Sequence, residues 1–159
     1  MNWIIRSAGE PDAGAISALI LGLSEYFIPD PESPDVQPFL ETLCPAATAE
    51  RIGSAEFDYF VAEDNAGIRG VIAVQSGKHL YHLFVDSRAQ RQGLARLLWN
   101  HARKHSEANA FTVNASPYAV PVYERLGFTI AKAAQKKNGL VFVPMTWATD
   151  PATESGEEK

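Results

Sequence analysis

The feature that most constrains the fold is a short glycine-containing loop between an apolar segment and a helical pattern. The apolar segment spans His79 to Val85, and the loop Gln90 to Ala95 opens a helical pattern that continues to about Lys104. The first backbone N–H groups of a helix have no partner inside the helix and carry partial positive charge. Because Gly93 has no Cβ, the chain there can approach an anion closely. The sequence therefore predicts a strand, a phosphate-binding loop and a helix in succession.

Turn residues divide the rest of the chain into short strands and helices. Apolar periodicity predicts helices at 11–27, 39–52 and 116–127, the second of them interrupted by Pro45. β-Branched content predicts further strands at 3–6, 58–63, 68–75, 111–114, 128–134 and 140–147. We expect Ser116 to cap the third of these helices and Gly127 to end it, and Lys136-Lys137-Asn138-Gly139 to join the last two strands. This order predicts an α/β protein of the α+β type, because it lacks the strict alternation of a doubly wound sheet.

Composition limits the classes of protein that fit. The chain has 159 residues, which predicts a single domain, here placed at 1–148, followed by a polar tail at 149–159 that we expect to be disordered. A net charge of −5 argues against nucleic-acid binding, which needs a basic surface. The longest apolar stretch, residues 16–23, is too short to cross a membrane. The single Cys44 cannot form an internal disulfide, and the N-terminus lacks a secretory signal, so we predict a cytoplasmic location.

The familiar nucleotide motifs do not explain the loop at Gly93. A P-loop would need GxxxxGK followed by Ser or Thr, but His79 follows Gly77-Lys78 and position 72 is Ile. A dinucleotide fingerprint would need GxGxxG after the first strand, and the sequence has none there. The pattern that remains is Gln-x-x-Gly-x-Ala after a central strand.

Two segments resemble the GCN5-related N-acetyltransferase (GNAT) family. Gln90-Arg91-Gln92-Gly93-Leu94-Ala95 fits the pyrophosphate loop of that family, written [QR]-x-x-G-x-[GA]. The later segment from Asn114 to Phe128 resembles the family in the spacing of its Asn, Tyr and Gly-Phe. The order of elements agrees over about residues 3 to 147. The first motif is short, whereas the second is longer and lies at the expected distance from it.

The resemblance implies a GNAT fold that binds acetyl-CoA as acyl donor. Its mixed, largely antiparallel sheet would have six to seven strands with helices on both faces, and coenzyme A would lie where the parallel strands 79–85 and 111–114 splay apart. The backbone N–H groups around Leu83, Phe84 and Val85 would bind the pantetheine arm and polarise the thioester carbonyl. The backbone amides of the loop would hold the pyrophosphate, and Arg91 and Arg96 would add positive charge. The loop residues are Gln90, Arg91, Gln92, Gly93, Leu94 and Ala95. Asn114 would contact coenzyme A or steady the next helix.

The resemblance also implies the reaction, a direct attack of a primary amine on the thioester in a ternary complex. Tyr123 would contact coenzyme A and protonate its departing thiolate, because a phenol positioned nearby can act as general acid. His79 or His82 would help to deprotonate the amine, since both lie on the strand beside the proposed thioester and histidine titrates near neutrality. Tyr81 and water are rival bases. The competing interpretations are that Tyr123 only packs in the core and that each histidine has a purely structural role.

Other readings stay open at this point. His101 and His105 have the spacing of a metal pair, but no third ligand is in view and we predict no metal. The acceptor would be a small molecule or a peptide amine, and aromatic and acidic residues near the first helices would suit a cation; these are Tyr26, Phe27, Pro29, Asp30, Glu32 and Phe39. A homodimer is one assembly that the resemblance allows. The alternative function is a non-catalytic acyl-CoA-binding or regulatory module on the same fold.

Overall fold

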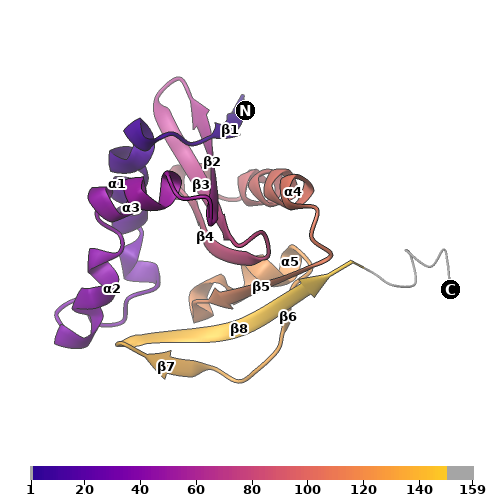
Figure 1. The fold of residues 1–159 in the computed structure, drawn as a ribbon. Coiled ribbons are helices and arrows are strands. Elements are labelled where there is room, and N and C mark those ends of the chain that lie inside the picture. The colour runs from indigo at the N-terminus through magenta and orange to yellow at the C-terminus, as the bar shows by residue number, and fades with distance from the viewer. Residues whose placement is uncertain (1, 150–159) are drawn as a thin grey trace, which may run out of the picture.

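A mixed sheet of eight strands runs through the computed structural model, which describes residues 2–149 (Figure 1). The strand order is β1-β2-β3-β4-β5-β8-β6, with β7 paired to β8, and every pair is antiparallel except β4 with β5. The strands are β1 (Ile4–Ser7), β2 (Phe57–Asp64), β3 (Gly67–Gln75), β4 (His79–Val85), β5 (Ala110–Ala115), β6 (Thr129–Ile130), β7 (Gln135–Lys137) and β8 (Leu140–Ala148).

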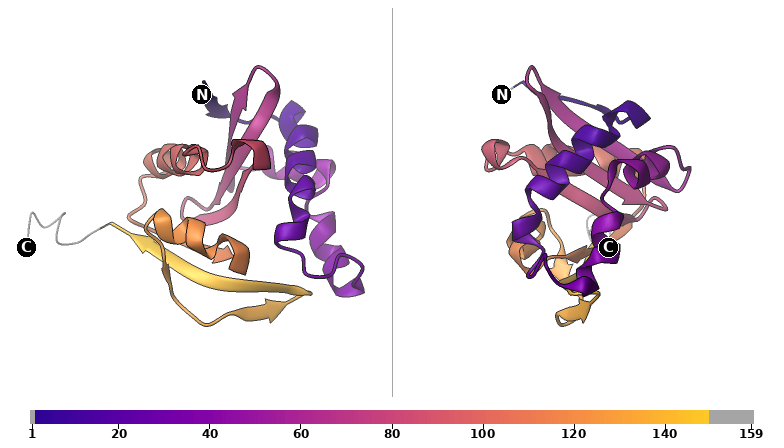
Figure 2. Two further views of the ribbon diagram at one scale, coloured as in Figure 1. Left: turned by 180° about the vertical axis from the view of Figure 1, so that it is seen from behind. Right: turned by 90° about the vertical axis from the view of Figure 1, so that its left-hand side faces the viewer.

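Helices cover both faces of this sheet, as Figure 2 shows. One face carries α1 (Ala13–Gly22), α2 (Gln37–Glu41) and α3 (Pro45–Ile52), and the other carries α4 (Leu94–Ser106), with α5 (Val120–Arg125) near the divergence of β4 and β5. Side chains of a strand alternate between the two faces, so Tyr59 and Val61 pack with α1 while Phe60 and Ala62 pack with α4. The predicted α+β class and the helices on both faces are confirmed. No helix within residues 2–149 is long and apolar enough to cross a membrane.

The helix α4 is held by a dense aromatic core. Trp99 is 1% exposed and contacts three other rings, those of Phe111, Phe128 and Trp147, with ring centroids 4.9, 5.1 and 5.4 Å away. Leu94, at the first position of the helix, is equally buried. The middle of α4 is therefore anchored to β5 and β8 through Trp99, and the first residue of the helix is buried in the same core.

A β-bulge in β4 separates the two halves of the sheet. Ala73 pairs with His82, but the next residue of β3, Val74, pairs with Leu80, so Tyr81 is an extra residue in β4. β4 and β5 pair only at His79 with Thr112 and at Leu80 with Val113. The strands part directly after the paired stretch, which confirms the predicted splayed parallel pair.

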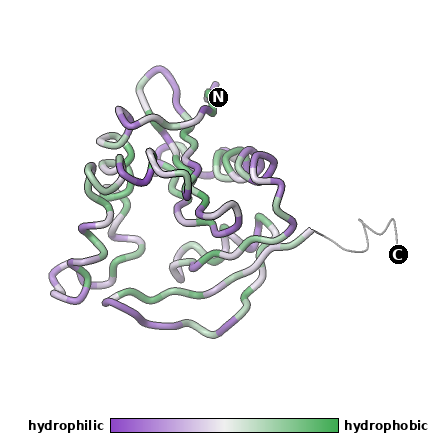
Figure 3. The backbone as a smooth tube through the Cα atoms, in the orientation of Figure 1, coloured by the Kyte–Doolittle hydropathy of each residue, from purple (hydrophilic) through white to green (hydrophobic). Residues whose placement is uncertain are grey.

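The C-terminal strands differ from the prediction. A single strand at 128–134 was expected, but only Thr129–Ile130 of that segment is a strand, β6. A second short strand, β7, follows at Gln135–Lys137, and the sheet has eight strands rather than six or seven. The residues between them are Ala-Lys-Ala-Ala, which have little β-propensity, and only two residues of β8, Val143 and Pro144, span this gap of four. The turn is also shorter than predicted, since Lys136 and Lys137 belong to β7 and only Asn138-Gly139 turns. Figure 3 shows the hydrophilic β7 lying against the apolar first half of β8.

The predicted tail at 149–159 lies outside the described residues except for Thr149. The N–H of that residue donates to Asn109 O over 2.9 Å.

Candidate active site

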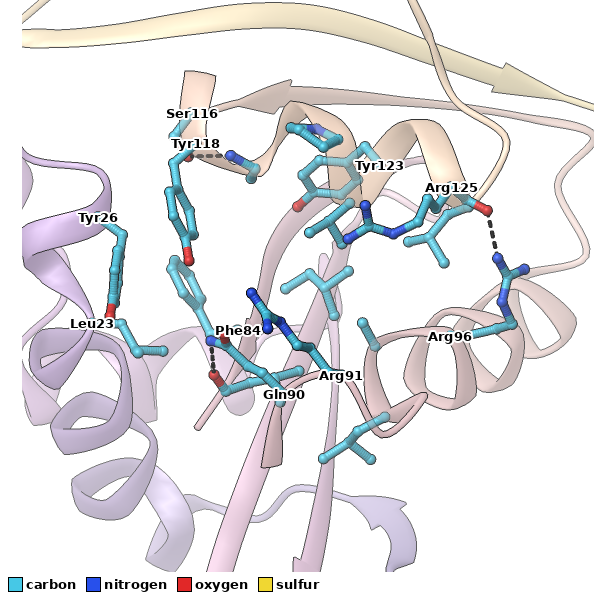
Figure 4. Close-up of a pocket in the computed structure, with 18 of the residues that line it drawn as sticks. Leu23, Tyr26, Phe84, Gln90, Arg91, Arg96, Ser116, Tyr118, Tyr123 and Arg125 are labelled. Carbon is cyan, nitrogen blue, oxygen red and sulfur yellow. Dashed lines mark hydrogen bonds between the residues drawn. The ribbon is translucent and has the colours of Figure 1, made fainter. Parts of the chain in front are cut away.

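A cavity of about 540 Å³ opens where β4 and β5 diverge (Figure 4). Its walls are the end of β4, the loop into α4, the helix α5 with the turn before it, and the segment 23–27 after α1. Most of the lining is apolar. The charged side chains among the described lining residues are all arginines, namely Arg91, Arg96 and Arg125.

The backbone of β4 presents free polar groups to this opening. The N–H of Asp86 donates to Arg69 O at 2.8 Å, so Asp86 and, by alternation, Phe84 direct their backbone groups to β3. Leu83 and Val85 therefore direct theirs into the gap between β4 and β5. The side-chain amide of Gln90 donates to Val85 O at 3.0 Å. Within residues 2–149 no strand pairs with the Leu83 N–H, the Leu83 carbonyl or the Val85 N–H.

The loop into α4 forms the second polar wall. Gly93 is the N-cap of α4 with φ of +83°, a left-handed conformation that favours glycine. The first bond of the helix, from Leu97 N–H to Gly93 O at 3.1 Å, leaves the N–H groups of residues 94–96 without a helical partner. Arg91 also has a positive φ, +66°. The predicted strand, glycine-containing loop and helix are thus present, and the N–H groups that begin the helix are of the kind that suits an anion.

Arg125 is a lining residue that the sequence interpretation missed. It ends α5 two residues before Gly127, and Figure 4 shows its guanidinium and that of Arg91 pointing into the cavity from opposite walls. The Arg96 guanidinium donates to the backbone O of Arg125, which ties the two helices together. Arg88 is exposed instead and pairs with Asp86 at 3.1 Å, and its guanidinium holds the pKa of that carboxyl below its usual value. A positive residue in the last turn of the predicted helix was the available signal for Arg125.

Tyr123 is fixed by the end of α5. The Phe128 N–H donates to Tyr123 O and the Gly127 N–H to Glu124 O, both at 3.0 Å, which is the Schellman pattern with Gly127 at φ +103°. The ring meets that of Phe128 edge-on at 5.5 Å, and the residue is only 6% exposed. Its hydroxyl points into the cavity in Figure 4. Burial raises the pKa of the Tyr123 phenol well above its usual range, so this group stays protonated at neutral pH.

The two strand histidines lie outside the lining of the cavity. His82 is 6% exposed on the α1 face, and burial together with the positive charge of Arg51 lowers its pKa to about 3. Its Nε2 is buried and has no hydrogen-bond partner among the residues that the structure describes. His79 is half-buried at the start of β4, with Nδ1 2.7 Å from Thr112 Oγ1, and burial lowers its pKa too. Tyr81, the bulge residue, packs on Phe57 and Arg51.

The burial of His82 predicts an acid-sensitive fold. In the unfolded chain a histidine has a pKa near 6.5, so below that pH the unfolded state binds a proton that folded His82 does not. We expect stability to be full above about pH 6.5 and to fall by about 1.4 kcal/mol per pH unit towards pH 3 from this group. Urea unfolding at several pH values measures the slope, which His82→Leu should flatten.

The control for this measurement is His101→Leu, because the His101 side chain is exposed. An unchanged slope in His82→Leu would show that other groups control the acid response.

Two of the predicted cofactor residues lie apart from the cavity. The cofactor residues named from the sequence all line it except Gln92 and Asn114. The side-chain amide of Gln92 donates to Arg88 O at 3.2 Å, and Asn114 is exposed on β5 opposite Pro144. Within residues 2–149, no group of three or more His, Cys, Asp or Glu side chains is placed to hold a metal ion.

Comparison with known proteins identifies the family of this fold and cavity. A family model for the acetyltransferase (GNAT) domain matches residues 27–149, which is more than three quarters of the chain. The chain belongs to the GNAT acetyltransferase family. No curated protein sequence matches it. The predicted family is thereby confirmed, and with it the acyltransferase class.

Solved GNAT structures share the fold at low sequence identity. A GCN5-related N-acetyltransferase from Rhodopseudomonas palustris is 19% identical, with a TM-score of 0.76 over 93% of this chain and 96% of that one. The PaiA N-acetyltransferase of Thermoplasma acidophilum, in complex with coenzyme A, is 12% identical with a TM-score of 0.78 over 93% and 99%. A variant of the spermidine N-acetyltransferase SpeG from Vibrio cholerae is 18% identical with a TM-score of 0.66 over 98% of each chain. These likenesses place the GNAT domain of this chain in a well-populated fold.

Proposed function

We propose that this GNAT protein is an acetyl-CoA-dependent N-acetyltransferase that acts on a primary amine by direct attack within a ternary complex. The observation that carries the proposal is the position of Tyr123, a buried and protonated phenol whose hydroxyl enters the cavity between the free edge of β4 and the arginine-lined loop. The family, a structural neighbour in complex with coenzyme A and a spermidine N-acetyltransferase of the same fold support it.

The lining of the cavity fits an acyl-CoA. Such a donor carries anionic phosphates at one end and an amide-bearing arm with a thioester at the other, which it supplies as the activated acyl group. The three cavity arginines and the N–H groups of residues 94–96 suit the phosphates. The free backbone groups of Leu83 and Val85 suit the amides and the thioester carbonyl.

Gly93→Ala tests the donor loop. A Cβ at this position meets no described atom within 4 Å, so the change introduces a left-handed alanine, at about 1–2 kcal/mol of stability, and a methyl group where the ligand approaches. We expect coenzyme A to bind at least about tenfold more weakly, as when a hydrogen bond to a charged group is lost. Calorimetric titration measures the affinity.

Gly77→Ala is the matched control, because Gly77 also has a positive φ, +73°, but lies away from the cavity. An equal loss of affinity in both variants would mean that general destabilisation, and not the loop, weakens binding.

The proton movements can be assigned to two residues. Tyr123 keeps its proton until the thiolate forms and then donates it. His82, with a pKa of about 3, is a weak base and serves better as a buried structural group. His79 lies four residues before Leu83, or roughly 13 Å along an extended strand, so it would receive the amine proton through intervening water. Its Thr112 partner would orient the imidazole.

A panel of primary amines assayed for thiol release tests the function directly. Release of coenzyme A that depends on amine, with acetylated amine as product, is the expected result. Thermal stabilisation by acetyl-CoA without thiol release towards any amine would favour the non-catalytic acyl-CoA-binding module, because a ligand that binds only the folded state stabilises it. Absence of both effects would overturn the donor assignment as well.

Composition bears on the location and the partners of the protein. One cysteine in 159 residues and a net charge of −5 support a reducing, cytoplasmic location and partners other than nucleic acid or membrane. A homodimer remains a proposal for a sedimentation measurement.

A further inference from the structure

A second hollow adjoins the donor cavity on the far side of a tyrosine pair. It has a volume of about 240 Å³ and shares three wall residues with the donor cavity, namely Tyr26, Phe27 and Tyr118. Its other walls come from the segment after α1, from the turn before α5 and from β8; these residues are Glu25, Ile28, Pro29, Pro117 and Val141. We call this space the acceptor hollow.

The partition between the two spaces is an aromatic stack. The rings of Tyr26 and Tyr118 lie 4.6 Å apart at 27°, although they come from opposite sides of the opening, and Figure 4 shows them at its edge. Tyr26 is 38% and Tyr118 55% exposed. Each ring covers one face of the other, so the outer faces, the ring edges and the hydroxyls of the pair are what remains exposed.

The two spaces carry opposite charge. The charged residues of the donor cavity are three arginines, whereas the charged residue of the acceptor hollow is Glu25. Among the described residues 2–149 the Glu25 carboxylate forms neither an ion pair nor a hydrogen bond. An unpaired carboxylate next to exposed aromatic faces is a setting that attracts an organic cation.

We propose that the acceptor is a diamine, whose distal ammonium lies in the acceptor hollow at Glu25 and the tyrosine faces while its other nitrogen reacts in the donor cavity. This inference rests on the proposed N-acetyltransferase function. The reacting nitrogen, an ammonium in solution, loses one proton before it attacks and a second as the N–C bond forms and the C–S bond breaks. The thiolate takes a proton from Tyr123; of the two protons that leave the nitrogen, one restores the Tyr123 phenol and the other passes to solvent. The distal ammonium is unchanged, so its charge serves recognition alone.

The charge of the acceptor hollow predicts an order of kcat/KM among acceptor amines of the same chain length. A diaminoalkane gains an exposed ion pair and a cation–π contact, which together amount to about a three- to thirtyfold advantage in kcat/KM over the matching amino alcohol. An ω-amino acid places its carboxylate against Glu25 and should be the poorest of the three. An apolar occupant, the other candidate for a hollow with so many aromatic groups, would instead favour the plain alkylamine.

The test measures kcat/KM for these four amines at saturating acetyl-CoA, in the intact protein and in Glu25→Gln. We expect Glu25→Gln to lower kcat/KM for the diamine about two- to fivefold and to leave the amino alcohol unchanged. Glu32→Gln is the matched control, an exposed acid in the same segment that does not line the hollow. Tyr118→Ala, checked by thermal melting for folding, should reduce the diamine preference further.

The outcomes separate this inference from the function on which it rests. Thiol release without preference for the diamine, or an equal effect of Glu25→Gln and Glu32→Gln, overturns the diamine site alone. A preference for the alkylamine overturns it in favour of an apolar acceptor. Absence of thiol release with every amine removes the proposed function, and the diamine site with it.

Discussion

Tyr123→Phe is expected to lower kcat by about 10²- to 10⁴-fold, the range over which a positioned general acid contributes. The ring remains between Phe128 and the cavity wall, so only the hydroxyl is lost. Because burial keeps the phenol protonated, the loss should be similar from neutral to moderately alkaline pH. Steady-state kinetics with thiol detection gives kcat, and titration of coenzyme A should give an unchanged affinity.

Tyr59→Phe is the matched control for this loss. Tyr59 is equally buried, and its hydroxyl accepts from Arg51 Nε at 2.8 Å on the α1 face, away from the cavity. We expect its kcat to stay near that of the unmodified protein. If Tyr123→Phe keeps kcat within a few-fold of the value for the unmodified protein, Tyr123 only packs in the core. Water would then supply the proton to the thiolate.

Trp99→Ala is expected to destabilise the fold by about 3–5 kcal/mol, as when a large buried aromatic residue is truncated. The side chain is 1% exposed and its removal leaves three rings without their common neighbour. For a protein of this size the loss corresponds to roughly 6–20 °C in the melting temperature. Urea unfolding measures it, and added acetyl-CoA should recover part of it because α4 carries the donor loop.

The control for Trp99→Ala lies on the same helix. Leu97 is 46% exposed, so Leu97→Ala should change stability by no more than about 0.5 kcal/mol. Both changes introduce alanine, the best helix former, so neither weakens the helix itself. Equal losses in the two variants would contradict the core packing of Trp99 as the anchor of α4.

Much of the fold could be predicted because local chemistry and tertiary structure agree. The strand at His79–Val85, the Gly93 loop and the Gly127 helix end are all present. The prediction was wrong at residues 128–134, where an alanine-rich stretch interrupts pairing that its flanks continue. The bulge at Tyr81 has no signal in the sequence either, since it depends on how β3 and β4 align across the sheet.

The candidate site was predictable where it depends on backbone and less so where it depends on tertiary placement. Ten of the predicted cofactor residues line the cavity. Nine of them follow one another along β4 and into α4, and the tenth, Tyr123, lies on α5, which the sequence predicted as a helix. The histidines share the strand with Leu83, but the pleat and the bulge direct His82 to the α1 face. Arg125 and Tyr118 meet the cavity only through the way α5 packs, which no spacing along the chain reveals.

The bulge at Tyr81 has one further consequence. Beyond it, β4 is a strand edge in the middle of the sheet, with amide groups that neither β5 nor another strand pairs. Free edges usually invite association with other chains, and proteins cover them. Here α5 and the tyrosine stack lie beside this edge and border the cavity of about 540 Å³ that covers it. A bound acyl-CoA would thus pair with amide groups of β4 that the other strands leave unpaired.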